Sequence, residues 1–347
     1  MRRYNDNSDY MSREMDAELG QLEEILTALY ANATNEITEQ FTEYSKKIKT
    51  KLKAWRELLE QGLITETDYQ AMVRNKILND ILFQATIAAL TNTLVNTDVA
   101  AMAIVRGDLP YVIAQSYNFI QSLGWKYADD AGFSVGTFQI YNANSVQILI
   151  KNNPDLLPYV DLPLDEKWNK DRINTVITQG IIQGDDMQTV ANKLQTVAKM
   201  DETTAMRTAR TSMTYAENLG RDESYKNLKE KGLPVKKKWS AILDERTRDT
   251  HRLLNGTFAN EKGLFGEGIL NVLLRCPADP QGEPQEIYNC RCREGVVFEN
   301  SVVDHSNDDD LYEQFMREED PQSYEALKER DYFRQHRSKA YGYNQRW

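Results

Sequence analysis

The chain has few of the residues that build cross-linked or metal-rich scaffolds. Its 347 residues include three cysteines, three histidines and nine prolines. Three cysteines are too few for a disulfide-built fold, and no apolar signal-peptide core follows the first methionine. We therefore expect the protein to be made and to work in a reducing cytoplasm. The net charge of −11 argues against a protein that coats nucleic acid, although it leaves room for a local basic patch.

A long uninterrupted hydrophobic run is also missing. The most apolar stretch, residues 81–105, is long enough to span a bilayer, but Gln84, Asn92, Asn96 and Asp98 interrupt it. We therefore predict a pair of buried helices there and no association with a membrane. With 41% hydrophobic and 27% charged residues, the composition is that of a soluble, mostly ordered protein of two or three domains.

Long stretches of the chain show the periodicity of amphipathic helices. Apolar residues recur every three or four positions from Met15 to Leu59 without a proline between them, which predicts one long helix. At ~1.5 Å per residue this helix would be on the order of 70 Å long. It could pack in a bundle within the chain or dock on another subunit. Thr65 and Asp68 predict the start of the next helix, and residues 106–112 predict a break.

These patterns predict a mainly α fold, with a long helical N-terminal region followed by a small α+β domain and a charged C-terminal tail. We expect four consecutive parts: a helical region over 1–123, a second helical block with a linker over 124–235, a compact α+β core over 236–300, and the tail over 301–347. The second part also holds a candidate strand at 137–141.

The compact core contains the residues that could bind a metal or take part in a reaction. Cys290 and Cys292 flank Arg291, and in a strand such neighbours point to one side with the residue between them pointing to the other. Two thiols on one side, with His251 from a distant loop, are compatible with a zinc site, and Cys276 could be its fourth ligand. Alternatively, the two cysteines are small apolar core residues and His251 is a hydrogen-bonded histidine that ties its loop to the strand.

A redox pair is less compatible, because the one-residue spacing differs from Cys-x-x-Cys. We therefore predict no cofactor, with zinc as the candidate if one is bound. The expected elements around these residues are a strand at Trp239, a turn at Asp244, Arg246 and Thr247, and a short helix that contains His251 and ends at Gly256.

Familiar catalytic patterns are missing. The chain has no phosphate-binding glycine loop, no Gly-x-Ser-x-Gly and no His-Glu-x-x-His, so we predict no catalytic residues and no enzyme activity. A transferase-like activity around Arg210 and His251 is the alternative. Arg207 and Arg210 share a helix face and could bind phosphate or a carboxylate, but we expect Arg210 to form a salt bridge to the compact core instead.

The last residues, 331–347, alternate cations with aromatic side chains, as proteins that bind nucleic-acid backbones do. A solvated tail would have the same composition. The candidate contacts to nucleic acid are Arg334, Arg337, Lys339, Arg346 and Trp347.

Three ordered motifs, "ARTSMTYAENLGRDESY", "KKKWSAILDERTRDTHRLLNG" and "NCRCREGVVF", span about residues 205–298. Together they resemble the phage Mu F-like minor head protein family, also called phage head morphogenesis proteins. The residues that carry the resemblance, with Trp239 in the strand between them, are Arg210, Thr211, Asp244, Arg246, Thr247, His251, Gly256, Asn289, Cys290, Arg291 and Cys292. Many members have a Cys-x-x-Cys in the second motif and a histidine before the final Cys-x-Cys. This chain instead has Arg248, His251 and Ile287 at those positions.

The resemblance implies a minor head protein of a tailed double-stranded DNA phage. Such a protein would assemble in the host cytoplasm, lie near the portal in the virion head, and affect DNA packaging or ejection. The portal protein is the implied partner, with the major capsid or scaffolding protein and the packaged DNA as further candidates.

Overall fold

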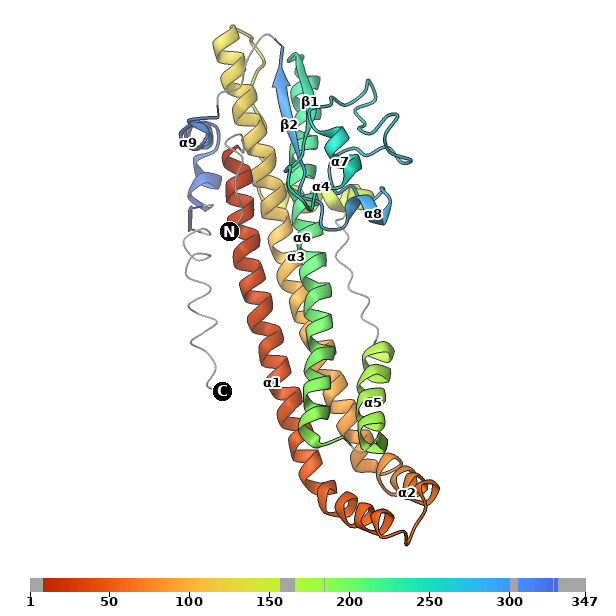
Figure 1. The fold of residues 1–347 in the computed structure, drawn as a ribbon. Coiled ribbons are helices and arrows are strands. Elements are labelled where there is room, and N and C mark those ends of the chain that lie inside the picture. Colours follow the sequence, from red (N-terminus) through yellow and green to blue (C-terminus); the bar gives the residue numbers. More distant parts are fainter. Residues whose placement is uncertain (1–8, 157–165, 184, 300–304, 327, 330–347) are drawn as a thin grey trace. The chain divides into compact units, whose positions relative to one another are not determined.

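The computed structural model describes residues 9–156, 166–183, 185–299, 305–326 and 328–329 (Figure 1). These residues form two compact units. Unit 1 draws on Met1–Ile25, Ile104–Val160 and Arg207–Trp347, and unit 2 on Leu26–Ala103 and Asp161–Met206. The units cut across the four consecutive parts predicted from the sequence, because three long helices each contribute residues to both units.

Helix α1, Tyr10–Glu60, is the single 51-residue helix that the periodicity predicts. Its apolar stripe from Met15 to Leu52 is buried along its length. The next helix, α2 (Glu66–Val73), begins as predicted. The Thr65 side chain accepts from the Asp68 N–H at 3.1 Å, and the Thr65 N–H donates to the Asp68 carboxylate at 2.9 Å. This reciprocal pair satisfies two amide groups that a helix start leaves without partners.

The predicted helix pair and the break at residues 106–112 are wrong. Helix α3, Ile81–Ala131, runs through both segments with Pro110 inside it. A proline costs a helix one hydrogen bond, but Leu109, Val112 and Ile113 around it are buried, and their packing keeps the helix continuous. Among the described residues, α3 is the one helix long and apolar enough to cross a membrane, and half of its most apolar window is buried. This is weak evidence for a membrane span, since a buried core helix passes the same test.

Unit 2 is built from parts of α1, α3 and α6 (Met187–Glu230), with α2, a π-helical turn at Arg74–Leu78 and α5 (Glu166–Gln183). Its core is a continuous apolar cluster to which each of these elements contributes. Members include Phe41, Val73, Ile77, Leu90, Ile177 and Leu194.

Unit 1 contains the predicted small α+β core. Strands β1 (Val235–Ser240) and β2 (Arg293–Phe298) pair antiparallel, with Val235 opposite Phe298 and Ser240 opposite Arg293. Alternate residues of β1 are buried, so Val235, Lys237 and Trp239 face inward. Three short helices complete this part of the fold: α4 (Ala143–Asn152), α7 (Asp249–Leu254) and α8 (Pro284–Ile287).

The predicted strand at residues 137–141 is wrong, because the segment has no regular secondary structure. The side-chain amide of Asn118 on α3 takes the place of a partner strand. It donates to the carbonyl of Tyr141 and accepts from the Tyr141 N–H, both at 2.8 Å. The ring of Tyr141 also stacks on that of Tyr117, with the ring centroids 3.8 Å apart.

Part of the predicted charged tail is folded. Helix α9, Asp308–Glu319, buries Tyr312, Phe315 and Met316 in unit 1. The candidate nucleic-acid contacts Arg334, Arg337, Lys339, Arg346 and Trp347 lie outside the described residues.

Candidate functional site

His251, Cys290 and Cys292 gather into one buried cluster, which we call the thiol–histidine cluster. The Nδ1 atom of His251 lies 3.3 Å from the sulfur of Cys292 and 3.7 Å from that of Cys290. The three donor atoms all lie within 4.8 Å of one another, and all three side chains are buried. The cluster therefore joins α7 to the segment that leads into β2.

The two thiols face His251 together, as the sequence predicts, while Arg291 between them bonds to Asp244. The predicted strand at these residues is wrong, however, because β2 begins only at Arg293. Side chains of α6 form hydrogen bonds with the backbone carbonyls that a neighbouring strand would otherwise bond to. The Thr214 hydroxyl donates to the carbonyl of Cys290 at 3.0 Å, and the Asn218 amide donates to that of Cys292 at 3.1 Å.

Trp239 on β1 covers the side of the cluster that faces the sheet. Its ring is fully buried and meets the His251 ring edge to face, with centroids 5.3 Å apart. Gly256 ends the α7 turn at φ +82°, a conformation that favours glycine. Its N–H donates to the carbonyl of Trp239 at 2.8 Å, which ties α7 back to β1.

Glu286 on α8 is a member of the site that sequence reasoning missed. Its Oε2 atom lies 3.1 Å from Nε2 of His251 and accepts from the Thr250 hydroxyl at 2.9 Å. A carboxylate beside one ring nitrogen favours the orientation of the imidazole in which the other nitrogen faces the thiols. The only signal in the sequence was an acidic residue four positions before Cys290.

The two thiols do not share the same proton affinity. The hydrogen bond from Cys292, followed by the contact with His251, lowers the pKa of Cys290 well below its usual value. The same hydrogen bond and burial raise the pKa of Cys292.

The cluster supplies three of the four donors that a structural zinc ion takes, at spacings that suit the ion. Tetrahedral zinc with bonds of about 2.3 Å to sulfur and about 2.0 Å to nitrogen places its donors about 3.5–3.8 Å apart, close to the 3.3 and 3.7 Å separations here. His251 would bind through Nδ1, with Glu286 on its other nitrogen, and Cys290 and Cys292 would supply sulfur. Bound zinc would crosslink α7 to the start of β2.

Cys276, the predicted fourth ligand, is not among the donors that gather there. The carbonyl of its neighbour Arg275 instead accepts from buried Lys237 at 2.6 Å, and Lys237 also pairs with Asp222 at 2.5 Å. Burial and the Asp222 carboxylate raise the pKa of Cys276. Cys276 thus lies beside a second buried ionic group.

Arg210 pairs with a different element from the one predicted. Its Nε donates to Glu23 on α1 at 2.6 Å, whereas we expected an acceptor in the compact core. The pair joins α6 to α1 because both residues lie where these helices pack in unit 1. Thr211 next to it does contact the core, since its hydroxyl accepts from the N–H of Asn289 at 3.0 Å, a residue with φ +54°.

Arg221 is another residue that sequence reasoning missed. Its side chain is fully buried and donates to both carboxylate oxygens of Asp9 at 2.8 Å and to Glu217 at 3.0 Å. It also donates to the carbonyl of Glu294 on β2 at 3.1 Å. Burial alone would raise the pKa of Asp9, but the Arg221 guanidinium lowers it below the usual value. One arginine thus links α6, the residue preceding α1, and β2.

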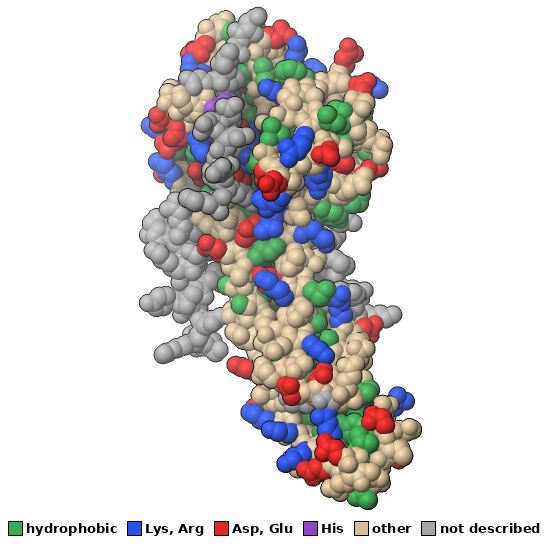
Figure 2. Space-filling view, viewed as in Figure 1, with side chains coloured by type: hydrophobic (Ala, Val, Ile, Leu, Met, Phe, Trp, Pro, Cys, Tyr) green, Lys and Arg blue, Asp and Glu red, His purple; other side chains and the backbone are tan. Residues whose placement is uncertain are grey.

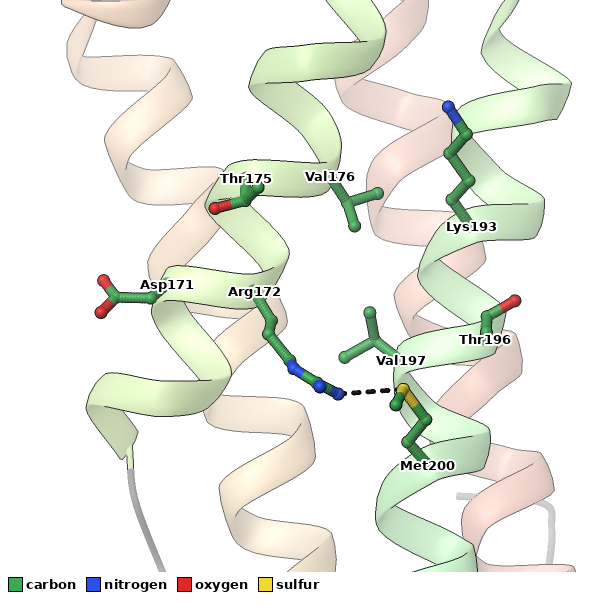
Figure 3. A pocket seen from close by; sticks show the side chains of 8 residues that line it. All are labelled: Asp171, Arg172, Thr175, Val176, Lys193, Thr196, Val197 and Met200. Carbon is green, nitrogen blue, oxygen red and sulfur yellow. Dashed lines mark hydrogen bonds between the residues drawn. The ribbon is translucent and has the colours of Figure 1, made fainter.

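Unit 2 has a separate groove of about 470 Å³ between α5 and α6 (Figure 3). Val176, Val197 and Met200 form its apolar part, and Arg172 donates across it to the sulfur of Met200 at 2.9 Å. The groove contains none of the motif residues, so we place the functional site in unit 1.

Residues 171–294 match the model of the family described as Phage Mu protein F like protein. These residues are similar to that family. The match confirms the predicted resemblance. The Mu F-like region, as we call residues 171–294, contains Arg210, Trp239 and the whole thiol–histidine cluster.

Two relatives are similar in sequence to part of the chain. The minor head protein GP7 of Bacillus phage SPP1 is 28% identical over 189 residues, which cover 53% of this chain and 59% of that protein. NAD(+)--arginine ADP-ribosyltransferase EFV of Enterococcus faecalis is 29% identical over 121 residues, which cover 34% of this chain and 24% of that protein. The chain thus spans about three fifths of the first relative and about a quarter of the second. No solved structure matches the chain significantly.

Proposed function

We propose that this protein is a minor head protein of a tailed double-stranded DNA phage. In this proposal it assembles in the host cytoplasm, joins the head near the portal and influences DNA packaging or ejection. The observation that carries it is the match of residues 171–294 to the Phage Mu protein F like family, supported by the similarity to the SPP1 minor head protein.

The architecture suits a docking role. Helices α1 and α3 each have 51 residues, which at ~1.5 Å per residue gives each a length of roughly 75 Å. Long helices offer extended surface to a partner. The compact core instead has side-chain contacts that crosslink distant segments, such as Arg291 with Asp244 and His251 with the two cysteines. The portal protein is the partner we propose, with the major capsid or scaffolding protein as the next candidates.

We propose that the protein acts without catalysing a reaction. His251 has Glu286 at one ring nitrogen and the two thiols at the other, and Arg291 is held by Asp244 at 2.6 Å. These groups are positioned to hold structure. The ADP-ribosyltransferase relative shares only 24% of its length with this chain, so its name does not carry its activity here.

Zinc at the thiol–histidine cluster is part of the proposal as a structural ion. A second candidate function is contact with packaged DNA inside the head. The aromatic and basic composition of residues 331–347 favours it.

Quantitative mass spectrometry of purified particles of the encoding phage tests the main proposal. We expect the chain in mature heads at or below the copy number of the portal protein, with the major capsid protein as the internal standard. Co-expression with the portal protein alone should give a complex that survives size-exclusion chromatography. A chain that is abundant in infected cells and absent from both particles and portal complexes would contradict the proposal.

A further inference from the structure

Several motif residues line one hollow in unit 1, which we call the arginine pocket. Its volume is about 460 Å³. The walls come from α1, α6, the turn that precedes α7, and the segment that precedes β2. The charged residues of its lining are Arg210, Arg246, Arg248, Arg291, Arg293, Asp16, Glu23 and Glu217.

Three of these arginines are neutralised by carboxylates. Arg293 lies 3.0 Å from Asp16 and 3.2 Å from Glu217, and only 13% of its side chain is exposed. The bidentate pair with Asp244 occupies Arg291, and Glu23 occupies the Nε atom of Arg210. These pairs hold the walls of the pocket in place.

The other two arginines give the pocket a net positive charge, because its five arginines face four carboxylates, those of Asp16, Glu23, Glu217 and Asp244. Arg246 comes no closer than 4.0 Å to Asp244, which already accepts two bonds from Arg291, and 72% of the Arg246 side chain is exposed. Arg248 donates to the backbone carbonyl of Tyr288, which carries no net charge. On the face of the molecule shown in Figure 2, Lys and Arg lie interspersed with Asp and Glu.

We propose that the arginine pocket binds a phosphate group, with Arg246 and Arg248 as its main donors and the free end of the Arg210 guanidinium as a third. Guanidinium groups recognise the oxygens of a phosphate through paired N–H donors. Excess positive charge in a hollow also concentrates anions there, in a chain whose net charge is −11. The phosphate could belong to free inorganic phosphate or to the backbone of duplex DNA. Only the second source rests on the proposed head function.

The test uses the full chain and two probes. Isothermal titration measures the binding of inorganic phosphate, and fluorescence anisotropy measures the binding of a labelled DNA duplex of about 20 base pairs at low salt. Arg246→Ala is the test variant, because its one ion pair is long and its side chain is mostly exposed. Arg317→Ala on α9 is the control, because it removes a similarly exposed arginine of unit 1.

We expect the wild type to bind at least one probe, Arg246→Ala to weaken that binding about tenfold, and Arg317→Ala to change it less than about twofold. Binding of phosphate shows that the free ion is recognised, and binding of the duplex alone identifies DNA as the source. The proposal is overturned if neither probe binds, or if the two variants behave alike. None of these results bears on whether the chain is found in the virion, so the two proposals fail separately.

Discussion

Arg291 donates to both carboxylate oxygens of Asp244 at 2.6 Å, while the cysteines on either side of it contact His251. A single tripeptide thereby links the segment before β2 to α7 through its outer residues and to the turn before α7 through its middle one. The compact core is thus held together by polar contacts between segments about forty residues apart.

The Arg291–Asp244 pair should contribute measurably to stability. We expect Arg291→Ala to lower the free energy of unfolding by about 1 kcal/mol, as for a well-aligned bidentate pair that solvent partly screens, since 37% of the Asp244 side chain is exposed. The hydrogen bond from Arg291 lowers the pKa of Asp244, so this contribution is present at neutral pH and is lost as the pH falls through the acid range. Urea denaturation measures both effects. Arg246→Ala should cost less than about 0.5 kcal/mol, and equal losses in the two variants would argue against a special role for the pair.

Zinc binding should depend on the thiol–histidine cluster and not on Cys276. We expect protein purified without chelators to contain close to one zinc per chain by elemental analysis, and Cys292→Ser to lose it because a hydroxyl is a poor zinc ligand. Cys276→Ser should keep the metal, because Cys276 lies outside the cluster. Removal of the metal should lower the melting temperature of the wild type. A zinc-free protein whose melting temperature does not respond to a chelator would instead support an apolar role for the two cysteines.

Gly220 on α6 permits a close approach to α3. A β-carbon at this position would lie 2.3 Å from the carbonyl oxygen of Ile113, so Gly220→Ala must push the two helices apart. We expect it to cost about 2 kcal/mol in chemical denaturation. Gly20→Ala on α1 is the matched control, since nothing lies within 4 Å of its added carbon. That variant should stabilise the helix by about 0.5–1 kcal/mol, and a similar gain at Gly220 would contradict the packing seen here.

Unit 2 should lose stability as the pH rises. Burial, together with the nearby Asp98 carboxylate, raises the pKa of Asp201 to about 7, while Arg172 opposes the shift. The folded state therefore holds a proton that the unfolded state releases near pH ~4. This stabilisation is complete below that pH and is lost as the pH rises through about 7. We expect the melting temperature to fall between about pH 5 and pH 8.

Asp201→Asn should flatten this pH dependence, whereas Asp171→Asn, at an exposed position of α5, should leave it unchanged. Asp98 must be considered with Asp201, because it accepts from the buried hydroxyl of Tyr30 at 2.5 Å and from Asn169 at 3.4 Å. A profile that is identical in the wild type and in Asp201→Asn would place the titrating group elsewhere.

Local sequence determined the features that depend on short-range periodicity and chemistry. The apolar spacing of α1 specifies a helix because only a 3.6-residue period places Met15 through Leu52 on one face. The Thr65–Asp68 cap needs only residues that are neighbours in the chain. The alternation at Cys290 and Cys292 likewise set both thiols on one side, even though the segment is not a strand.

Tertiary structure decided the features that depend on partners far along the chain. Pro110 predicted a break, but burial of its neighbours outweighs one lost hydrogen bond. Asn118 replaced a strand partner for Tyr141. Glu286, Arg221 and the Glu23 partner of Arg210 became visible only once the packed helices and loops brought them together. Side-chain contacts of this kind follow from three-dimensional proximity, which no local pattern of residues encodes.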